Sequence, residues 1–166
     1  MSEGEKTVQM EIRGLMLDPS SNVPIVILQD ADGSLFLPIW IGVFEANAIA
    51  LRIEGVEAPR PLTHDLLHSV VGHLDAEVEK VEICSLKENT FYAIIHVRQH
   101  ESVMEIDARP SDAIALALRA EAPIFVRWSV LEQAKAIDLA ADLDNEERLK
   151  KWLEQMKPEE FGKYKM

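Results

Sequence analysis

The chain of 166 residues is 48% hydrophobic, which provides enough apolar material for the core of one domain. Its formal net charge of −12 excludes broad electrostatic attraction to nucleic acid or to an anionic membrane, because such attraction depends on clustered Lys and Arg. The sequence has no apolar run of about 20 residues, no signal-peptide pattern and a single cysteine, so we expect a cytoplasmic protein without a membrane partner.

The first part of the chain predicts three strands followed by a helix. Apolar and polar residues alternate in the first strand, and turn residues at 18–22 and 30–33 separate it from two further apolar strands. Pro38 in the third strand indicates an edge or a bulge, because proline cannot donate to a sheet ladder. The expected strands span residues 8–17, 25–28 and 35–41, and the expected helix spans residues 44–54.

The second part of the chain predicts the same order after an inserted helix. This inserted helix is expected at residues 64–74, with Thr63 as its N-cap, and three more strands follow it. The last strand leads into a helix that we expect to have Ser111 as its N-cap. The expected strands span 76–86, 90–97 and 103–106, the helix spans 112–121, and a short strand at 124–126 and a short helix at 130–136 come next.

Ten residues of the first expected helix align with ten residues of the second. Residues 45–54 (EANAIALRIE) and 112–121 (DAIALALRAE) share six identical positions at a spacing of 67 residues. A repeat that occurs only twice favours an internally duplicated domain over an open solenoid, which needs three or more units. We therefore predict an α+β fold in which two strand–strand–strand–helix units form one compact domain at residues 7–137, with the two units related by a rotation near twofold.

Residues 138–166 predict a separate C-terminal helical extension. Residues 146–156 have the spacing of an amphipathic helix, and Pro158 ends it. The apolar face of this helix consists of Leu149, Trp152, Leu153 and Met156. This face and the sheet edges need cover, so we expect a homo-oligomer, most simply a dimer, although the helix has the alternative of packing on its own domain.

Two segments place the same residue types at a helix start. Residues 60–65 (RPLTHD) and 109–112 (RPSD) each contain an arginine, a proline, a hydroxyl and then a carboxylate. Free amides at a helix start beside an arginine favour a phosphate site. A purely structural role as helix caps and ion pairs explains the same pattern. The candidate phosphate-binding residues are Arg60, Thr63, Arg109 and Ser111.

Three carboxylates near helix starts are the candidates for catalysis. Glu45, Asp65 and Asp112 would converge if a pseudo-twofold axis relates the two halves. Mg²⁺ or Mn²⁺ is typically held by one or two carboxylates together with waters and substrate phosphates, so Asp112 and Glu45 are candidate metal ligands. His64 is a candidate acid or base. It also has the spacing of a metal pair with His68, but the glutamate of a zincin motif is absent between them.

Four further blocks occur along the chain: EIRGL at 11–15, LPIWIG at 37–42 followed by EA at 45–46, RPLTHD at 60–65 and IDARPSDA at 106–113. Together these blocks resemble the bifunctional nuclease family. They occur in the order expected for that family, the resemblance covers residues 7–137, and the ending FGKY at 161–164 is similar to tails of bacterial members. The resemblance implies a compact α+β domain that commonly self-associates, and nuclease activity on DNA and RNA as attributed to plant members. It brings no agreed set of catalytic residues.

Two functions of different classes are consistent with these observations. The first is a metal-dependent nuclease that uses Mg²⁺ or Mn²⁺ and has only weak non-specific affinity for DNA or RNA. The second is a non-catalytic regulatory or small-anion-binding homo-oligomer, in which the same side chains are caps and ion pairs. The net charge of −12 favours the second hypothesis, whereas the carboxylates placed beside arginines at helix starts favour the first.

Overall fold

Two three-strand meanders lie on either side of strand β7 (Ile124–Arg127) in the computed structural model, which describes residues 4–134 and 137–138. The strand order of the sheet in the described residues is β6-β5-β4-β7-β1-β2-β3-β8. The first meander consists of β1 (Thr7–Leu17), β2 (Pro24–Asp30) and β3 (Leu35–Trp40), and the second of β4 (Ala76–Lys87), β5 (Thr90–Gln99) and β6 (Ser102–Ala108). The short strand β8 (Ile137–Asp138) pairs with β3.

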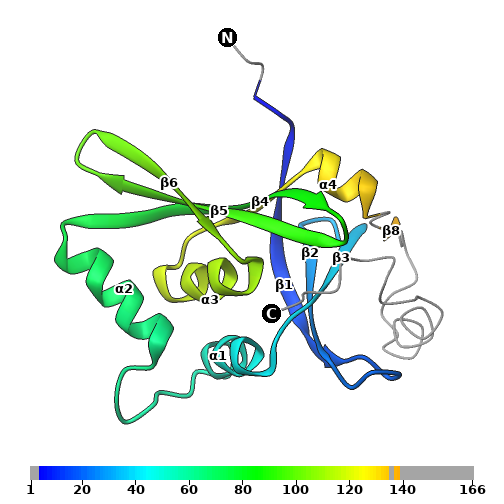
Figure 1. Cartoon of the computed structure of the whole chain (residues 1–166), viewed down its shortest axis with the longest axis horizontal. Coiled ribbons are helices and arrows are strands. Elements are labelled where there is room, and N and C mark those ends of the chain that lie inside the picture. The colour runs from blue at the N-terminus through cyan, green and yellow to red at the C-terminus, as the bar shows by residue number, and fades with distance from the viewer. Residues whose placement is uncertain (1–3, 135–136, 139–166) are drawn as a thin grey trace.

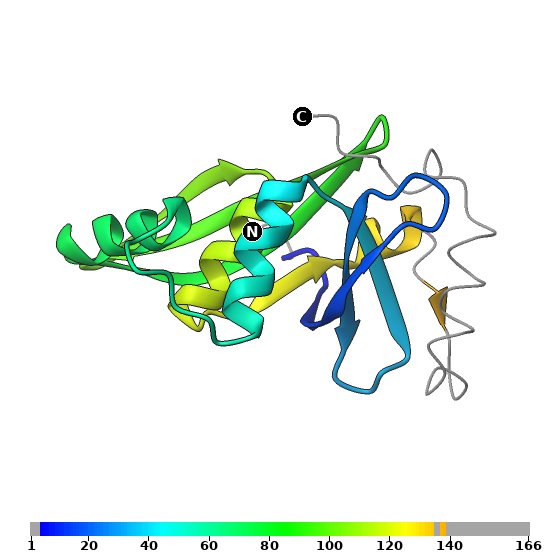
Figure 2. The same ribbon diagram turned by 90° about the horizontal axis from the view of Figure 1, so that it is seen from below.

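The arrangement of the strands confirms the predicted duplication. Strand β1 is antiparallel to β7 and β4 is parallel to it, so β1 and β4 run in opposite directions, as a twofold axis normal to the sheet requires. Each meander leads into one of the repeated helices, α1 (Val43–Ile53) and α3 (Pro110–Ala120). These two helices lie side by side (Figures 1 and 2). The alanines that the repeat shares allow this close approach, because they are small and all of them except Ala50 are buried.

Helix α3 is the centre of the core. Its residues from Ala113 to Ala117 are each at most 1% exposed, because α3 packs against α1, α2 (Thr63–His73), β4 and β5. A helix that is apolar on all sides requires such complete cover. Helix α1 is amphipathic by comparison and buries Ala46, Ala48 and Ile49. The starts of α1 and α3 are therefore fixed against each other by well-packed helices.

Helix α2 leaves most of its apolar side chains at the surface. Among these side chains only Val71 packs against the core, while the other four are between 40% and 60% exposed. The free edge of the sheet at β6 has exposed apolar side chains as well. We call the following side chains the α2–β6 surface: Leu66, Leu67 and Val70 on α2, Leu74 directly after α2, and Met104 and Ile106, which point to the same face of β6.

The N-caps predicted for α2 and α3 are wrong. Helix α2 begins at Thr63 itself and is preceded by Leu62, whose N–H donates to Oδ2 of Asp65 at 2.9 Å. Helix α3 begins at Pro110, so Ser111 lies inside the helix and is 1% exposed. Proline in the first helical position explains this early start, because its fixed φ suits the helix and its missing N–H removes no intrahelical bond.

The remaining predictions concern the end of the chain. The short strand β7 confirms the strand predicted at 124–126, and the short helix α4 (Trp128–Gln133) begins two residues before the helix predicted at 130–136. Helix α4 packs on β4 and β7. The predicted amphipathic helix at 146–156 lies outside the described residues. Within the described part of the chain, every helix is too short or too polar to cross a membrane.

Asp18 connects the turn between β1 and β2 to the end of β3 through hydrogen bonds. Its Oδ1 accepts the backbone N–H of Ser20 at 2.9 Å, and its Oδ2 accepts Nε1–H of Trp40 at 2.8 Å. The carboxylate is only 3% exposed. Burial by itself raises its pKa, but the hydrogen bonds from Trp40 and Ser20 outweigh burial and lower the pKa to about 2.

We therefore expect Asp18 to stabilise the fold in a pH-dependent way. A carboxyl whose pKa falls from 3.8 to about 2 on folding contributes on the order of 2 kcal/mol above pH 4, and this contribution is lost as the pH falls through 2. Asp18→Asn should lower the free energy of unfolding by about that amount at pH 7 and by much less at pH 2. Urea unfolding at both pH values measures the difference, and an equal cost at both would contradict it.

Candidate functional site

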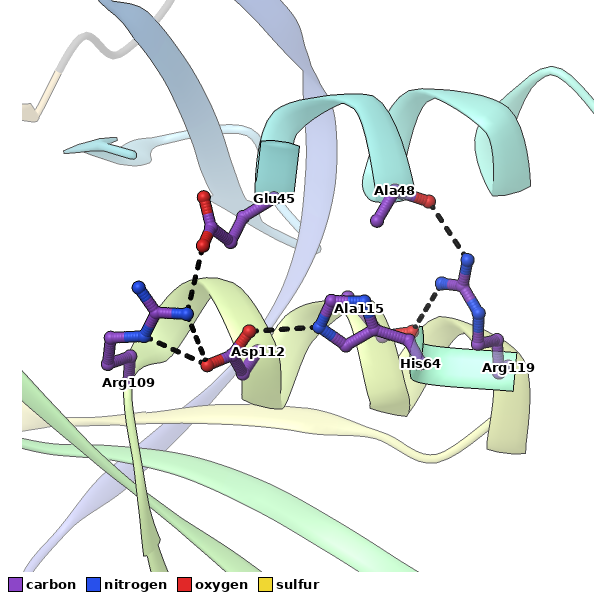
Figure 3. Close-up of polar contacts among 7 residues, drawn as sticks. All are labelled: Glu45, Ala48, His64, Arg109, Asp112, Ala115 and Arg119. Carbon is purple, nitrogen blue, oxygen red and sulfur yellow. Dashed lines mark hydrogen bonds and ion pairs between the residues drawn. The ribbon is translucent and has the colours of Figure 1, made fainter. Parts of the chain in front are cut away.

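The first turns of three helices meet at one side of the molecule. Glu45 belongs to the first turn of α1, His64 to that of α2 and Asp112 to that of α3. Arg109 is the residue directly before α3, so the side chains of these four residues approach one another, as Figure 3 shows. We call them the Asp112 cluster. The sequence places these residues up to 67 positions apart, and the packing of α1 and α2 on α3 brings them together.

Arg109 and His64 together occupy both oxygens of Asp112. Arg109 Nη2 lies 2.8 Å from Asp112 Oδ2 and donates to Glu45 Oε1 at 2.9 Å, while its Nε donates to the same Oδ2 at 2.9 Å. His64 Nε2 is 2.9 Å from Asp112 Oδ1. The guanidinium therefore bridges two carboxylates (Figure 3), and one of these carboxylates also orients the imidazole.

These contacts determine the charges of Asp112 and Arg109. The hydrogen bond with His64 is the largest cause that lowers the pKa of Asp112, Arg109 adds to it, and burial only partly opposes them. Burial lowers the pKa of Arg109, but Asp112 and Glu45 outweigh burial and raise it. Asp112 is therefore an anion at neutral pH and can only accept a hydrogen bond. His64 Nε2 must then carry the proton, which leaves Nδ1 as the free ring nitrogen.

Glu45 has one oxygen without a partner. Its side chain is 10% exposed, and Oε2 is buried with no hydrogen-bond donor among the described residues. A buried carboxylate oxygen is normally satisfied by a donor, a water or an ion, because leaving it unpaired costs free energy. Glu45 therefore marks a position where a cation or donor from a ligand would be stabilised.

The Asp112 cluster borders a pocket of about 810 Å³. The pocket lies between α1, α2, α3 and the strands β5 and β6, and all four members of the cluster line it. Most of the wall is apolar, so the pocket suits a ligand that combines a flat or apolar part with a polar group facing the cluster. The apolar lining includes Phe44, Leu67, Val71, Ile95, Val97 and Ile106.

The structure separates the other candidate residues from this cluster. Thr63 lines the same pocket, but Ser111 is buried and lines neither described pocket. Arg60 and Asp65 line a second pocket of about 350 Å³. Asp65 accepts hydrogen bonds from the Leu62 N–H and from Arg119 Nε, which lower its pKa, so it holds the start of α2 against α3.

Arg119 is a structural residue of the site that the sequence patterns did not single out. Its side chain is 5% exposed, and it donates to Ala48 O at 3.2 Å, to Ala115 O at 2.9 Å and to Asp65 Oδ1 at 2.6 Å. One arginine thereby connects α1, α2 and α3 behind the Asp112 cluster. The repeat contained a signal for it, because Arg119 matches Arg52 at one of the six identical positions.

A divalent ion fits this site only in an open coordination. The described residues contain no group of three or more His, Cys, Asp or Glu side chains placed around a common metal position. Glu45 and Asp112 nevertheless provide the hard oxygen donors that Mg²⁺ and Mn²⁺ prefer, and Glu45 Oε2 is unpaired. Arg109 and His64 already contact both oxygens of Asp112, so Glu45 Oε2 is the one unpaired oxygen of the two carboxylates, and an ion here would take most of its ligands from water or substrate.

Two related strand–helix units, with charged side chains from three helix starts at one pocket, define an internally duplicated α+β domain with a polar cluster beside that pocket. The chain belongs to the bifunctional nuclease domain family, whose model matches residues 26–138. The family expected from the four sequence blocks is thereby confirmed.

Several relatives cover large parts of this chain. An uncharacterized protein of Mycobacterium tuberculosis (strain CDC 1551 / Oshkosh) is 38% identical over 162 residues, which cover 92% of this chain and 97% of that protein. Bifunctional nuclease 1 of Oryza sativa subsp. indica is 26% identical over 125 residues, or 73% of this chain and 38% of the plant protein. Bifunctional nuclease 2 of Oryza sativa subsp. japonica is 27% identical over 129 residues, with shares of 75% and 40%. This chain matches less than half the length of these plant relatives.

Proposed function

We propose that this chain is a metal-dependent nuclease that hydrolyses phosphodiester bonds in DNA, RNA or both. The observation that carries the proposal is the Asp112 cluster, in which a carboxylate orients a histidine and an arginine stands beside an unpaired carboxylate oxygen at the rim of a pocket. The family and the names of the plant relatives give the proposal its reaction class. A nuclease needs a proton-transfer group and a cationic group at one phosphate, and this cluster offers both.

His64 is the proton-transfer residue in this proposal. Asp112 fixes the tautomer of the imidazole, so that Nδ1 is free to accept a proton from the attacking water or to return one to the leaving oxygen. Arg109 is the phosphate-binding residue. Its side chain is 40% exposed, and its Nη1 donors are left over after the bonds to Asp112 and Glu45.

Glu45 and Asp112 are the metal ligands in this proposal. An ion of Mg²⁺ or Mn²⁺ bound there supplies positive charge that stabilises the developing charge on the phosphate oxygens. The protein itself orients the phosphate through Arg109 and holds the proton at His64. The net charge of −12 makes such compensation necessary, since the surface otherwise repels a polyanion.

The test is cleavage of end-labelled single-stranded DNA and RNA in the presence and absence of the ion. We expect cleavage with Mn²⁺ or Mg²⁺, no cleavage in excess chelator, and tighter Mn²⁺ binding in calorimetry when a mononucleotide is present. Asp112→Asn purified in the same way is the matched control for contaminating nucleases. Cleavage that persists in chelator would rule out the metal, and an inactive wild-type protein would rule out the nuclease.

A second function is favoured by the closed hydrogen bonding of the cluster. Arg109 and His64 already satisfy both oxygens of Asp112, so this carboxylate needs no metal ion as a partner. In this second proposal the protein is a non-catalytic regulator that binds small anions at Arg109. Anion binding that depends on Arg109, without any cleavage of DNA or RNA, is the result that would favour it.

We also propose that the protein is a homo-oligomer, most simply a dimer. The α2–β6 surface has six exposed apolar side chains beside an open strand edge, and such surfaces are typical of contacts between subunits. We expect light scattering at micromolar concentration to give the mass of a dimer, and Val70→Glu to give a monomer. Tyr92→Glu, which changes an exposed side chain outside this surface, is the control. A wild-type monomer would contradict the proposal.

A further inference from the structure

The two pockets have opposite charge. The larger one is lined by the carboxylates of Glu45, Asp107 and Asp112 and by one arginine, Arg109. The smaller one is lined by three arginines and two carboxylates. The three arginines are Arg52, Arg60 and Arg119, and the two carboxylates are Glu57 and Asp65. The chain as a whole has a net charge of −12, so the excess of arginines in this pocket has to be explained by ion pairs within the protein or by a ligand.

Internal ion pairing does not account for this positive charge. Arg119 and Asp65 pair with each other at 2.6 Å, and the other oxygen of Asp65 accepts the Leu62 N–H. Arg52 and Arg60 are exposed, and neither makes an ion pair within 4.0 Å in the described part of the chain. Arg52 adds only the weakest of the attractions that lower the pKa of Asp65. Two guanidinium groups therefore remain available in one concave site.

The smaller pocket adjoins the larger one. Pro61 and Leu62 line both pockets, so a single short segment forms the wall between them. An elongated ligand that places one group at the Asp112 cluster therefore crosses this wall to reach Arg52 and Arg60. Guanidinium groups match phosphate oxygens because each offers paired N–H donors in a planar fork.

We infer that the smaller pocket is a subsite in which Arg52 and Arg60 hold a backbone phosphate of a polynucleotide strand, next to the phosphate at the Asp112 cluster. This inference rests on the proposed function for the identity of the strand. It explains how an acidic protein binds a polyanion, because the contact is confined to two arginines in a pocket. It also places the substrate across the Pro61–Leu62 wall, with bonds on either side of that wall contacted by different residues.

The experiment measures binding separately from cleavage. Fluorescence anisotropy in excess chelator follows a labelled 12-mer of deoxythymidine, and thymidine monophosphate and inorganic phosphate serve as competitors. We expect the double variant Arg52→Gln/Arg60→Gln to bind the 12-mer about 10-fold or more weakly, with a salt dependence reduced by roughly 1.4 in log–log slope. The affinity of thymidine monophosphate for the larger pocket, measured by its competition with the 12-mer, should be the same in the double variant and in the wild-type protein. Arg13→Gln, an exposed arginine of β1 outside both pockets, makes the same change of charge as each single variant.

The outcomes separate this inference from the proposed function. Weaker 12-mer binding in the double variant, but not in Arg13→Gln, supports the subsite even if the wild-type protein cleaves nothing. Cleavage by the wild type with an unchanged KM in the double variant would keep the nuclease and overturn the subsite. The subsite is also overturned if the wild-type protein binds inorganic phosphate but no 12-mer, or if the double variant binds like Arg13→Gln.

Discussion

Asp112→Asn is expected to reduce phosphodiester cleavage by about 100-fold or more, because it reverses the tautomer of His64. In the native protein Arg109 donates to Asp112 Oδ2, and Oδ1 accepts the proton on His64 Nε2. The amide of the variant must turn its oxygen toward Arg109 and its NH₂ toward His64. The ring nitrogen Nε2 then has to accept, so the proton moves to Nδ1 and the free base is lost.

The matched control for this variant is Asp107→Asn. Asp107 lines the same pocket and carries the same charge, but its side chain forms no hydrogen bond or ion pair with the Asp112 cluster. We expect it to change kcat by only a few-fold. Cleavage rates under single-turnover conditions, together with the unfolding midpoint of each variant, separate a chemical effect from a loss of fold. Equal cleavage rates for Asp112→Asn and Asp107→Asn would show that His64 and Asp112 do not take part in proton transfer.

Arg119→Met is expected to lower the free energy of unfolding by about 2–4 kcal/mol. Arg119 is almost fully buried and donates to Ala48 O, Ala115 O and Asp65. Methionine retains much of the apolar volume but leaves Ala48 O and the Asp65 carboxylate without this donor, and an unpaired buried polar group costs about 1–3 kcal/mol. Because the lost bonds connect three helices, the variant should also loosen the start of α2, where His64 lies.

Arg52→Met is the matched control for stability, because Arg52 occupies the equivalent position in the repeat and is exposed. A surface substitution of this kind should change stability by about 0.5 kcal/mol or less. Urea unfolding monitored through tryptophan fluorescence measures both variants. If both lose the same stability, the connection through Arg119 does not contribute what we expect from its burial and bonds.

The duplication was visible in the sequence because it depends on local patterns. Alternating residues predict strands, and the repeat of residues 45–54 at 112–121 predicts two equivalent helices whose alanines allow close contact with the sheet. The structure confirms the duplication, with two meanders around β7, and it places α1 and α3 mainly against each other. Such features need no knowledge of distant contacts, since each follows from the period of apolar residues along a short stretch of chain.

Helix starts were less predictable because several residues compete to begin a helix. Thr63 and Ser111 both have suitable hydroxyls for an N-cap, but α2 begins at Thr63 and α3 begins at Pro110. A carboxylate in the third position satisfies the N–H of Leu62, so no hydroxyl cap is needed there. The choice depends on packing around each helix start, which a short sequence window does not contain.

The sequence by itself determined the fold class, the family and the residue types of the site, including Glu45, His64, Arg109 and Asp112. Only the tertiary structure decided which of the candidates meet. It grouped these four, placed Arg60 and Asp65 at the other pocket, and gave Arg119 its role. The physical reason is that local propensity fixes where helices and strands lie along the chain, whereas the position of one helix start against another depends on the packing of the whole core.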